Sequence, residues 1–408
     1  MNTHLSGKEL FIESPLGKRL PDSEGAPVGV VRLDPEKSYA GVGALLQQVI
    51  DESSQEAWDS IKARIDYTFE SLEFALAPLR REPGFEENLK RRLRRGQKML
   101  FKPNLVGPFN IDVQTHGPGM GSTTCTEWPF IAALMRWFHE RMGVRYHQMA
   151  IGEAATALSA AAGLLTKMNP AGAAVTPEAV IEGRSGAFYG GWGFYFVRKY
   201  LAECAGFDPA DDPMQGFDAS VSGAYTPPGL GDQALRVYDL NRIYDDPRKG
   251  REVDVPGGVN YQAITLHKAI VGGDPADPED RRAYPGCILV NVPKLKVHCY
   301  TLLTGVIKNL GIGLYPMQYS KAGDCCWDYS NPHQSIPGMK GGIPHEIWVA
   351  DVDYETGLPK MDASRKPIVR KTGGISATMI DIIKAVQNQD IFMIHVVDAI
   401  EATNLDHM

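Results

Sequence analysis

Hydrophobic side chains recur along this chain with two periods, one typical of strands and one of helices. Short apolar runs rich in β-branched residues and bounded by glycine or proline predict buried strands. Apolar positions three and four residues apart predict helices between them. We predict strands at 28–33, 99–102, 146–151, 235–240, 287–292 and 391–397, and helices at 39–51, 52–96, 129–142, 154–168 and 374–387. This alternation indicates an α/β protein with a mostly parallel, Rossmann-like sheet flanked by helices.

The pattern is interrupted in three places, and these divide the chain. Residues 1–27 are polar and contain several prolines and glycines, so we expect a weakly ordered lead. Residues 52–96 and 169–230 are predicted insertions into one α/β domain at 28–408. The aromatic residues of the second insertion indicate a lid, a partner surface or ordinary packing. No terminating element follows the last strand, so we expect a chain that is truncated at its C-terminus.

The stretch from Ile288 to Gly313 joins a buried strand to a concentration of cations. Pro293 ends the strand, and Lys294, Lys296 and His298 then project to one side of an extended segment. No aspartate or glutamate intervenes before the next lysine, at position 308. Buried lysines are rare unless they are paired. The segment therefore predicts an anionic partner, with a solvated basic turn as the alternative.

A short helix is predicted directly after these cations. Thr301 or Thr304 would cap its first turn, and glycines end it. The helix carries Lys308 and Asn309. In open α/β sheets, a turn between a strand and the following helix lies at the carboxyl ends of the strands, where ligands bind.

Other polar residues are expected at the same edge of the sheet. Lys102 ends the strand at 99–102 and Asn104 follows it, and Thr115 and His116 lie in the glycine-rich loop after them. Lysines that are buried or close to one another have a lowered pKa, so one of them could act as a base; the same group could simply hold a phosphate or carboxylate. The predicted ligand-binding residues are Lys102, Asn104, Thr115, Lys294, Lys308 and Asn309, and the predicted proton-transfer residues are His298, His116 and Lys296.

The run VNVPKLKVH followed by TGVIKNLGIG resembles the signature of the family known as domain of unknown function 362 (DUF362). The segments Lys102-Pro103-Asn104-Leu105 and Thr115-His116 are similar to further family segments. The resemblance implies a family domain over roughly 28–160 and 234–408. Some relatives carry ferredoxin-type clusters, but this chain has no C-x-x-C-x-x-C run. A non-catalytic binding or assembly module for iron–sulfur proteins is therefore the alternative to an enzyme or cofactor-handling protein.

A remoter likeness concerns the N-terminal domain of nickel-pincer lactate racemase. The shared order is Thr-His in a loop, a strand, and then a histidine and a lysine before a glycine-ended helix. The likeness implies racemase-like proton transfer with a nickel–pyridinium cofactor, His116 as acid or base, and His298 with Lys308 beside the cofactor. The chain differs from the racemase pattern at Lys102-Pro103-Asn104, where that family has an arginine.

A metal site is a third alternative. Cys325, Cys326 and His333 lie in one long loop, and with His298 they could ligate a soft metal. Their spacing matches no zinc or iron–sulfur pattern.

Composition narrows the remaining classes of function. The net charge is −7 and the pI about 5.8, which argues against nucleic acid as a partner. No apolar run reaches the ~18–20 residues of a membrane helix, and the N-terminus lacks the apolar core of a secretion signal. We therefore expect a cytoplasmic protein with six reduced cysteines, no membrane contact and an anionic small molecule as ligand.

Overall fold

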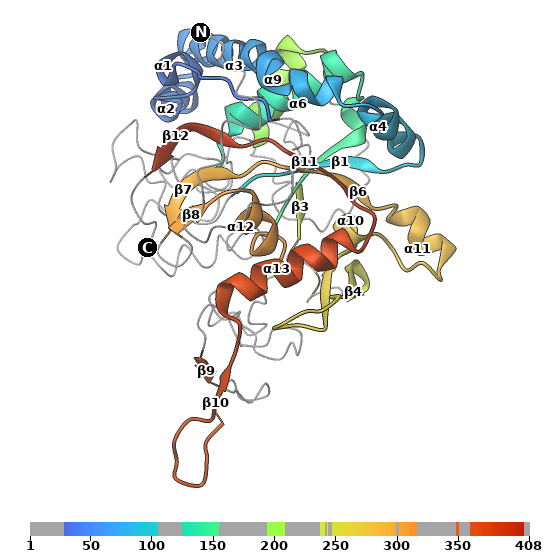
Figure 1. The fold of residues 1–408 in the computed structure, drawn as a ribbon. Helices are drawn as coiled ribbons and strands as arrows, with labels where there is room; N and C mark the ends of the chain where they lie inside the picture. Colours follow the sequence, from blue (N-terminus) through green and yellow to red (C-terminus); the bar gives the residue numbers. More distant parts are fainter. Residues whose placement is uncertain are drawn as a thin grey trace, which may run out of the picture.

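Five parallel strands form the central sheet of the protein, in the order β11-β6-β1-β2-β3 (Figure 1). The computed structural model describes residues 28–104, 125–154, 194–208, 237–240, 243, 247–298, 302–315, 348–350 and 360–403. The strands of the sheet are β1 (Lys98–Lys102), β2 (Met149–Glu153), β3 (Val237–Asp239), β6 (Cys287–Asn291) and β11 (Phe392–His395). The α/β class and the parallel sheet expected from the sequence are confirmed.

The order of the strands reverses between β1 and β6. The chain runs from β1 outward to β2 and β3, and then returns to the other side of β1 to add β6 and β11. Lys102 and His395 both lie opposite Asn291, so the three residues form one row at the carboxyl ends of their strands. A reversal of this kind opens a crevice outside the carboxyl ends, which is where open α/β sheets bind ligands.

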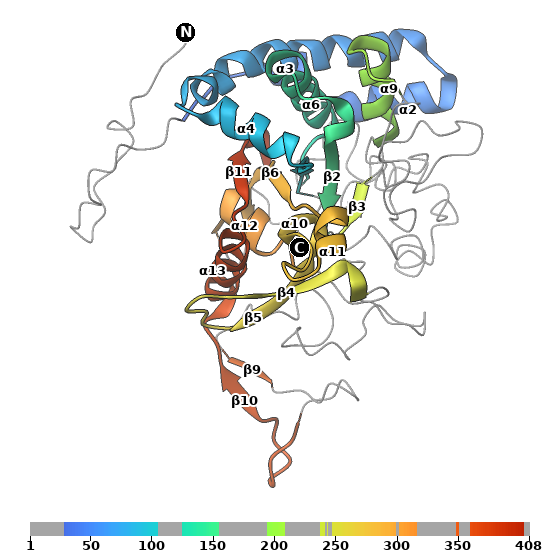
Figure 2. The same cartoon turned by 90° about the vertical axis from the view of Figure 1, so that its right-hand side faces the viewer.

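Helices cover both faces of the sheet (Figures 1 and 2). This explains why β2 and β6 are buried along their whole length, since a parallel sheet with two covered faces has no polar side. One face carries α2 (Val42–Glu52), α3 (Gln55–Arg81), α4 (Phe85–Arg94), α6 (Trp128–Met142) and α9 (Phe194–Cys204), and the other carries α10 (Lys268–Val271), α12 (Val306–Gly311) and α13 (Gly374–Gln387). The short helices α1 (Pro35–Ser38) and α11 (Pro278–Ala283) lie at the ends of the molecule.

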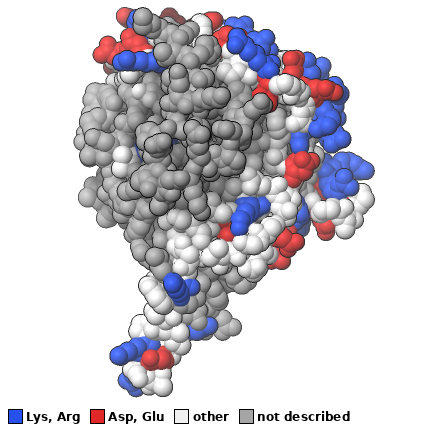
Figure 3. Space-filling view, in the orientation of Figure 1, with Lys and Arg blue, Asp and Glu red and all other residues white. Residues whose placement is uncertain are grey.

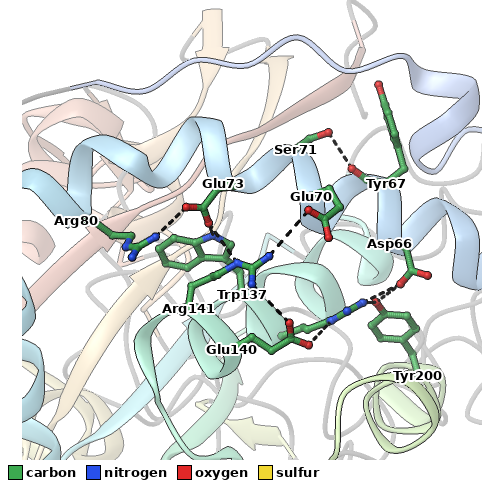
Figure 4. A network of polar contacts seen from close by, with 11 residues as sticks. Asp66, Tyr67, Glu70, Ser71, Glu73, Arg80, Trp137, Glu140, Arg141 and Tyr200 are labelled. Atoms are coloured by element: carbon green, nitrogen blue, oxygen red, sulfur yellow. Dashed lines mark hydrogen bonds and ion pairs between the residues drawn. The ribbon is translucent and has the colours of Figure 1, made fainter.

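Helix α3 belongs to the segment predicted as the first insertion, and it packs against α6. Its apolar positions recur at helical spacing and are buried, and Ser54 caps its first turn by accepting from the Ala57 N–H. Figure 4 shows a polar network along this contact, in which Arg136 pairs with Asp66 at 2.8 Å and Trp137 donates to Glu73 at 3.1 Å. The contact therefore combines apolar burial with ion pairs at its margin.

Two local predictions are wrong. No strand forms at 28–33, because this segment pairs with none of the described strands and Val28 and Val30 are left exposed. Thr304 does not cap α12: Gly305 is the cap, and Thr304 ends a strand instead. Thr301, the other predicted cap, lies outside the described residues. The segment 241–283, for which no element was predicted, contains the antiparallel pair β4 (Gly250–Asp254) and β5 (Ala263–His267).

A second sheet follows directly after β6, in the order β12-β7-β8. Its strands are β7 (Lys294–His298), β8 (Leu302–Thr304) and β12 (Asp398–Thr403). The polar side chains of Lys294, Lys296 and Thr304 are at most 2% exposed, whereas Val297 is 36% and Leu303 57% exposed. This distribution is the reverse of an ordinary half-buried sheet, so the buried side of the small sheet is its polar side.

The antiparallel pair β9 (Trp348–Ala350) and β10 (Val369–Lys371) extends away from the rest of the molecule as an arm (Figures 1 and 2). In the space-filling view, Lys and Arg side chains gather at the tip of this arm, while both signs of charge alternate over the described upper right of the molecule (Figure 3). None of the helices in the described ranges has both the length and the apolar character that a membrane crossing requires.

Candidate functional site

A buried ion pair joins the carboxyl ends of β1 and β2. The ammonium group of Lys102 lies 2.9 and 2.8 Å from the two carboxylate oxygens of Glu153, and both side chains are almost completely buried. The ammonium also donates to the Pro103 carbonyl at 2.8 Å and to Asn309 Oδ1 at 3.1 Å. Burial lowers the pKa of Lys102, although the attraction and hydrogen bonds of Glu153 act in the opposite direction.

Two asparagines continue this contact across the sheet. Asn309, on α12, donates from Nδ2 to the Lys102 carbonyl at 3.2 Å and to Asn291 Oδ1 at 2.7 Å. Asn291, at the end of β6, has its Nδ2 3.1 Å from the Val306 carbonyl and 3.3 Å from His395 Nδ1. A connected row of polar groups thus runs from Glu153 to His395, past the carboxyl ends of four neighbouring strands.

A second buried ion pair holds the start of β7. Lys294 Nζ lies 3.3 Å from Asp398 Oδ2 and donates to the Tyr39 hydroxyl at 2.5 Å. The Tyr39 hydroxyl in turn donates to Asp398 Oδ1 at 2.6 Å, and the backbone N–H of Glu127 donates to Asp398 Oδ2 at 3.2 Å. These contacts tie the segment after α1 and the start of α6 to the small sheet.

Lys296 and Lys308 are the other buried cations near this edge, at 1% and 8% exposure. Lys296 lies opposite Thr304 on β8, so the two side chains share the buried face of the small sheet. Asn104 is also buried, and its backbone N–H donates to Thr126 Oγ1, which donates to the Val292 carbonyl. These hydrogen bonds connect the chain beyond β1 to the chain beyond β6.

The structure therefore brings six of the predicted site residues to one edge, namely Lys102, Asn104, Lys294, Lys296, Lys308 and Asn309. The backbone of His298 ends β7, and nothing is described of its side chain. The remaining predicted residues, Thr115, His116, Cys325, Cys326 and His333, lie outside the described residues. Within the described ranges, no three His, Cys, Asp or Glu side chains gather closely enough to hold a metal ion.

The sequence predicted an anionic partner for the buried lysines but did not identify it. For Lys102 and Lys294, the partner is a carboxylate of the chain itself. Glu153 neutralises Lys102, and Asp398 neutralises Lys294. Tyr39, Asn291 and His395 were missed as well. His395 lies in the predicted strand 391–397 and Tyr39 begins the predicted helix 39–51. Nothing in the sequence marked either residue as part of a site, apart from its position near the end of an element.

Gly313 allows the chain after α12 to pass close to Lys102. A Cβ atom at this position would lie 2.1 Å from the Asn309 carbonyl oxygen and 2.6 Å from Lys102 Nζ. Gly313→Ala is therefore expected to displace both groups and to lower the free energy of unfolding by about 1–3 kcal/mol, as overpacking usually does. Urea unfolding measures this change.

Gly305→Ala is the matched control at the other end of the same helix. A Cβ atom there would meet nothing within 4 Å, so we expect a change on the order of 0.5 kcal/mol. If Gly313→Ala and Gly305→Ala lower the free energy of unfolding equally, the close approach at Gly313 does not limit stability.

The fold and the polar row define an α/β protein with a site at the point where its strand order reverses. Residues 232–407 match the model of the family described as "Domain of unknown function (DUF362)", and this part of the chain is a DUF362 domain. No curated protein and no solved structure matches the chain. The extension of the family likeness to residues 28–160 and the likeness to lactate racemase remain predictions.

Proposed function

We propose that the chain binds a small anionic molecule at the carboxyl ends of β1 and β6, and that a proton is transferred to or from the bound molecule there. The observation that carries the proposal is the reversal of strand order at a place where four lysines are buried, Lys102, Lys294, Lys296 and Lys308. Ligands of open α/β sheets bind in the crevice at such a reversal.

Burial of the four lysines supports an anionic ligand. Their side chains are at most 8% exposed, and a buried charge is unfavourable unless an opposite charge compensates it. Glu153 and Asp398 contact Lys102 and Lys294. We propose that the ligand contacts Lys296 and Lys308 at the same edge of the sheet, as the sequence pattern indicates.

Proton transfer is supported by the environment of Lys102. Its pKa is lowered by burial, and an amine with a lowered pKa gives up its proton more readily than an exposed lysine does. The proposal keeps His298 and His116 as proton-transfer residues and Thr115, Asn104 and Asn309 as ligand contacts, on the evidence of the sequence pattern. The proposal includes a cytoplasmic location, on the evidence of the sequence alone.

Anion binding to purified protein tests the proposal. Inorganic phosphate and oxalate are titrated into the protein by calorimetry, and native mass spectrometry reports any molecule that co-purifies. Lys296→Ala is expected to weaken binding of the anion at least tenfold, because it removes a charged hydrogen-bond donor worth about 1.5–3 kcal/mol.

Lys90→Ala is the control for Lys296→Ala, because Lys90 is an exposed lysine of α4 that pairs with Glu86. We expect it to bind both anions as the unmodified protein does. If neither anion binds and nothing co-purifies, or if the two variants bind alike, the proposed site is wrong.

The arm formed by β9 and β10 favours a second candidate, a binding module for an acidic protein such as an iron–sulfur carrier. Trp348 and Val369 are exposed on it, and Lys360, Arg365 and Lys366 are exposed toward its tip. An exposed cationic surface of this kind attracts a negatively charged partner. A protein in which Lys360, Arg365 and Lys366 are replaced by alanine, and which keeps its bound metabolites but loses a protein partner, would favour this candidate over the first.

A further inference from the structure

The donors and acceptors along the polar row are fixed by groups whose roles cannot change. A backbone carbonyl only accepts, so the atom of Asn309 that contacts the Lys102 carbonyl must be its nitrogen, and its oxygen then faces the Lys102 ammonium. The same nitrogen meets Asn291, which must present its oxygen. The Asn291 nitrogen is left to donate to the Val306 carbonyl and to His395 Nδ1.

This sequence of contacts determines the tautomer of His395. Because Nδ1 receives a hydrogen bond from an amide N–H, it carries no proton, and the ring proton lies on Nε2. Rotating the Asn291 amide would not reverse the arrangement, since its oxygen would then face the Val306 carbonyl and its nitrogen the Asn309 nitrogen. Only this orientation of the two amides agrees with every contact in the row.

His395 differs from the rest of the row in being exposed. It ends β11 beside Asn291, at the carboxyl edge of the sheet, and no described residue contacts its Nε2. Partial desolvation of the ring lowers the pKa of His395, which favours the neutral imidazole at neutral pH. A neutral ring with its proton on Nε2 can donate a hydrogen bond but cannot accept one at that atom.

We infer that His395 is a ligand-binding residue of the proposed site and donates its Nε2–H to an oxygen atom of the bound anion. It acts there as a neutral donor that orients the ligand, rather than as the acid or base of a proton transfer. The inference rests on the proposed function, since it names a further contact of the same site and the atom that makes it.

The tautomer is measured in protein labelled with ¹⁵N-histidine, whose long-range proton–nitrogen correlations distinguish Nδ1 from Nε2. We expect the His395 Nε2 to be protonated and Nδ1 bare at pH 7.5. Asn291→Asp replaces the amide donor by a carboxylate acceptor, so it should move the ring proton to Nδ1 and raise the pKa of His395. A proton on Nδ1 in the unmodified protein, or the same tautomer in both proteins, would overturn the assignment.

Binding of inorganic phosphate tests the role of the ring. His395→Leu removes the donor, and we expect about tenfold weaker binding, as for the loss of one hydrogen bond to a charged group. His395→Gln retains an N–H donor and should restore part of the affinity. Because His395 is exposed, these variants keep the fold and test the inference even where Asn291→Asp does not fold.

The outcomes separate this inference from the proposed function. If phosphate binds and Lys296→Ala weakens it, while His395→Leu binds as tightly as the unmodified protein, His395 is not a ligand contact and the anion site remains. If phosphate and oxalate bind to no form of the protein, the proposed function fails and the ligand role of His395 fails with it.

Discussion

Replacing Glu153 by leucine is expected to destabilise the protein by about 3–5 kcal/mol, the usual result of removing one partner from a buried ion pair. The reason is the environment of Lys102, whose side chain is 0% exposed. Without Glu153 the amine must either stay charged without compensation or lose its proton, and both cost free energy. The Pro103 carbonyl and Asn309 Oδ1 would still accept hydrogen bonds, but neither carries a compensating charge. Equilibrium unfolding in urea gives the change in free energy.

A double-mutant cycle shows whether the loss comes from the uncompensated charge. Lys102→Met combined with Glu153→Leu removes both charges, and replacing a whole buried pair by apolar residues is often close to neutral. The double variant is therefore expected to be more stable than Glu153→Leu alone. Glu86→Leu, on an exposed pair with Lys90, provides the control, with an expected change of about 0.3–0.5 kcal/mol. A double variant less stable than Glu153→Leu would show that packing, and not charge, sets the loss.

The central strands and their lysines could be predicted because their signals are local. Each strand is a short apolar run, and Lys102 and Lys294 follow such runs directly in the sequence. The helix at 374–387 was predicted with its observed bounds, because its apolar positions recur at helical spacing over almost four turns.

The sequence did not show which carboxylate each lysine would contact, because the pairing depends on the order of strands in the sheet. Lys102 meets Glu153 only because β2 is the neighbour of β1. Lys294 meets Asp398, 104 residues away, only because β12 pairs with β7. The sequence shows that a buried lysine needs an anion, but not whether the chain or a ligand supplies it.

The errors in local structure have the same origin. The apolar run at 28–33 has the composition of a strand, yet a strand requires a partner, and no described strand lies beside it. Thr304 has the chemistry of a helix cap, but its pairing with Lys296 across β7 and β8 places it in a sheet. In both places the presence or absence of a partner strand overrides the preference of the residue itself.

Two of the four lysines, Lys102 and Lys294, contact a carboxylate of the chain, and each contact joins elements that are far apart in the sequence. Lys296 and Lys308 are buried near the same edge and are the proposed ligand contacts. Loss of Glu153 or Asp398 should therefore lower the stability of the protein, whereas loss of Lys296 should lower its affinity for the anion.

Asp398→Ala is expected to have the second large effect, again about 3–5 kcal/mol, because it leaves Lys294 buried without its carboxylate. The same carboxylate accepts from the Tyr39 hydroxyl and from the Glu127 backbone N–H. The loss should therefore be largest where Tyr39 holds the N-terminal segment, and amide hydrogen exchange in α1 and α2 should become faster than in α13. Tyr39→Phe keeps the ion pair and removes two hydrogen bonds of the hydroxyl, one from Lys294 and one to Asp398. We therefore expect a smaller loss, of about 1.5–3 kcal/mol. If Tyr39→Phe is as unstable as Asp398→Ala, the hydroxyl rather than the charge of Lys294 dominates this contact. If exchange in α1 and α2 stays unchanged in Asp398→Ala, the N-terminal segment is held by its apolar packing alone.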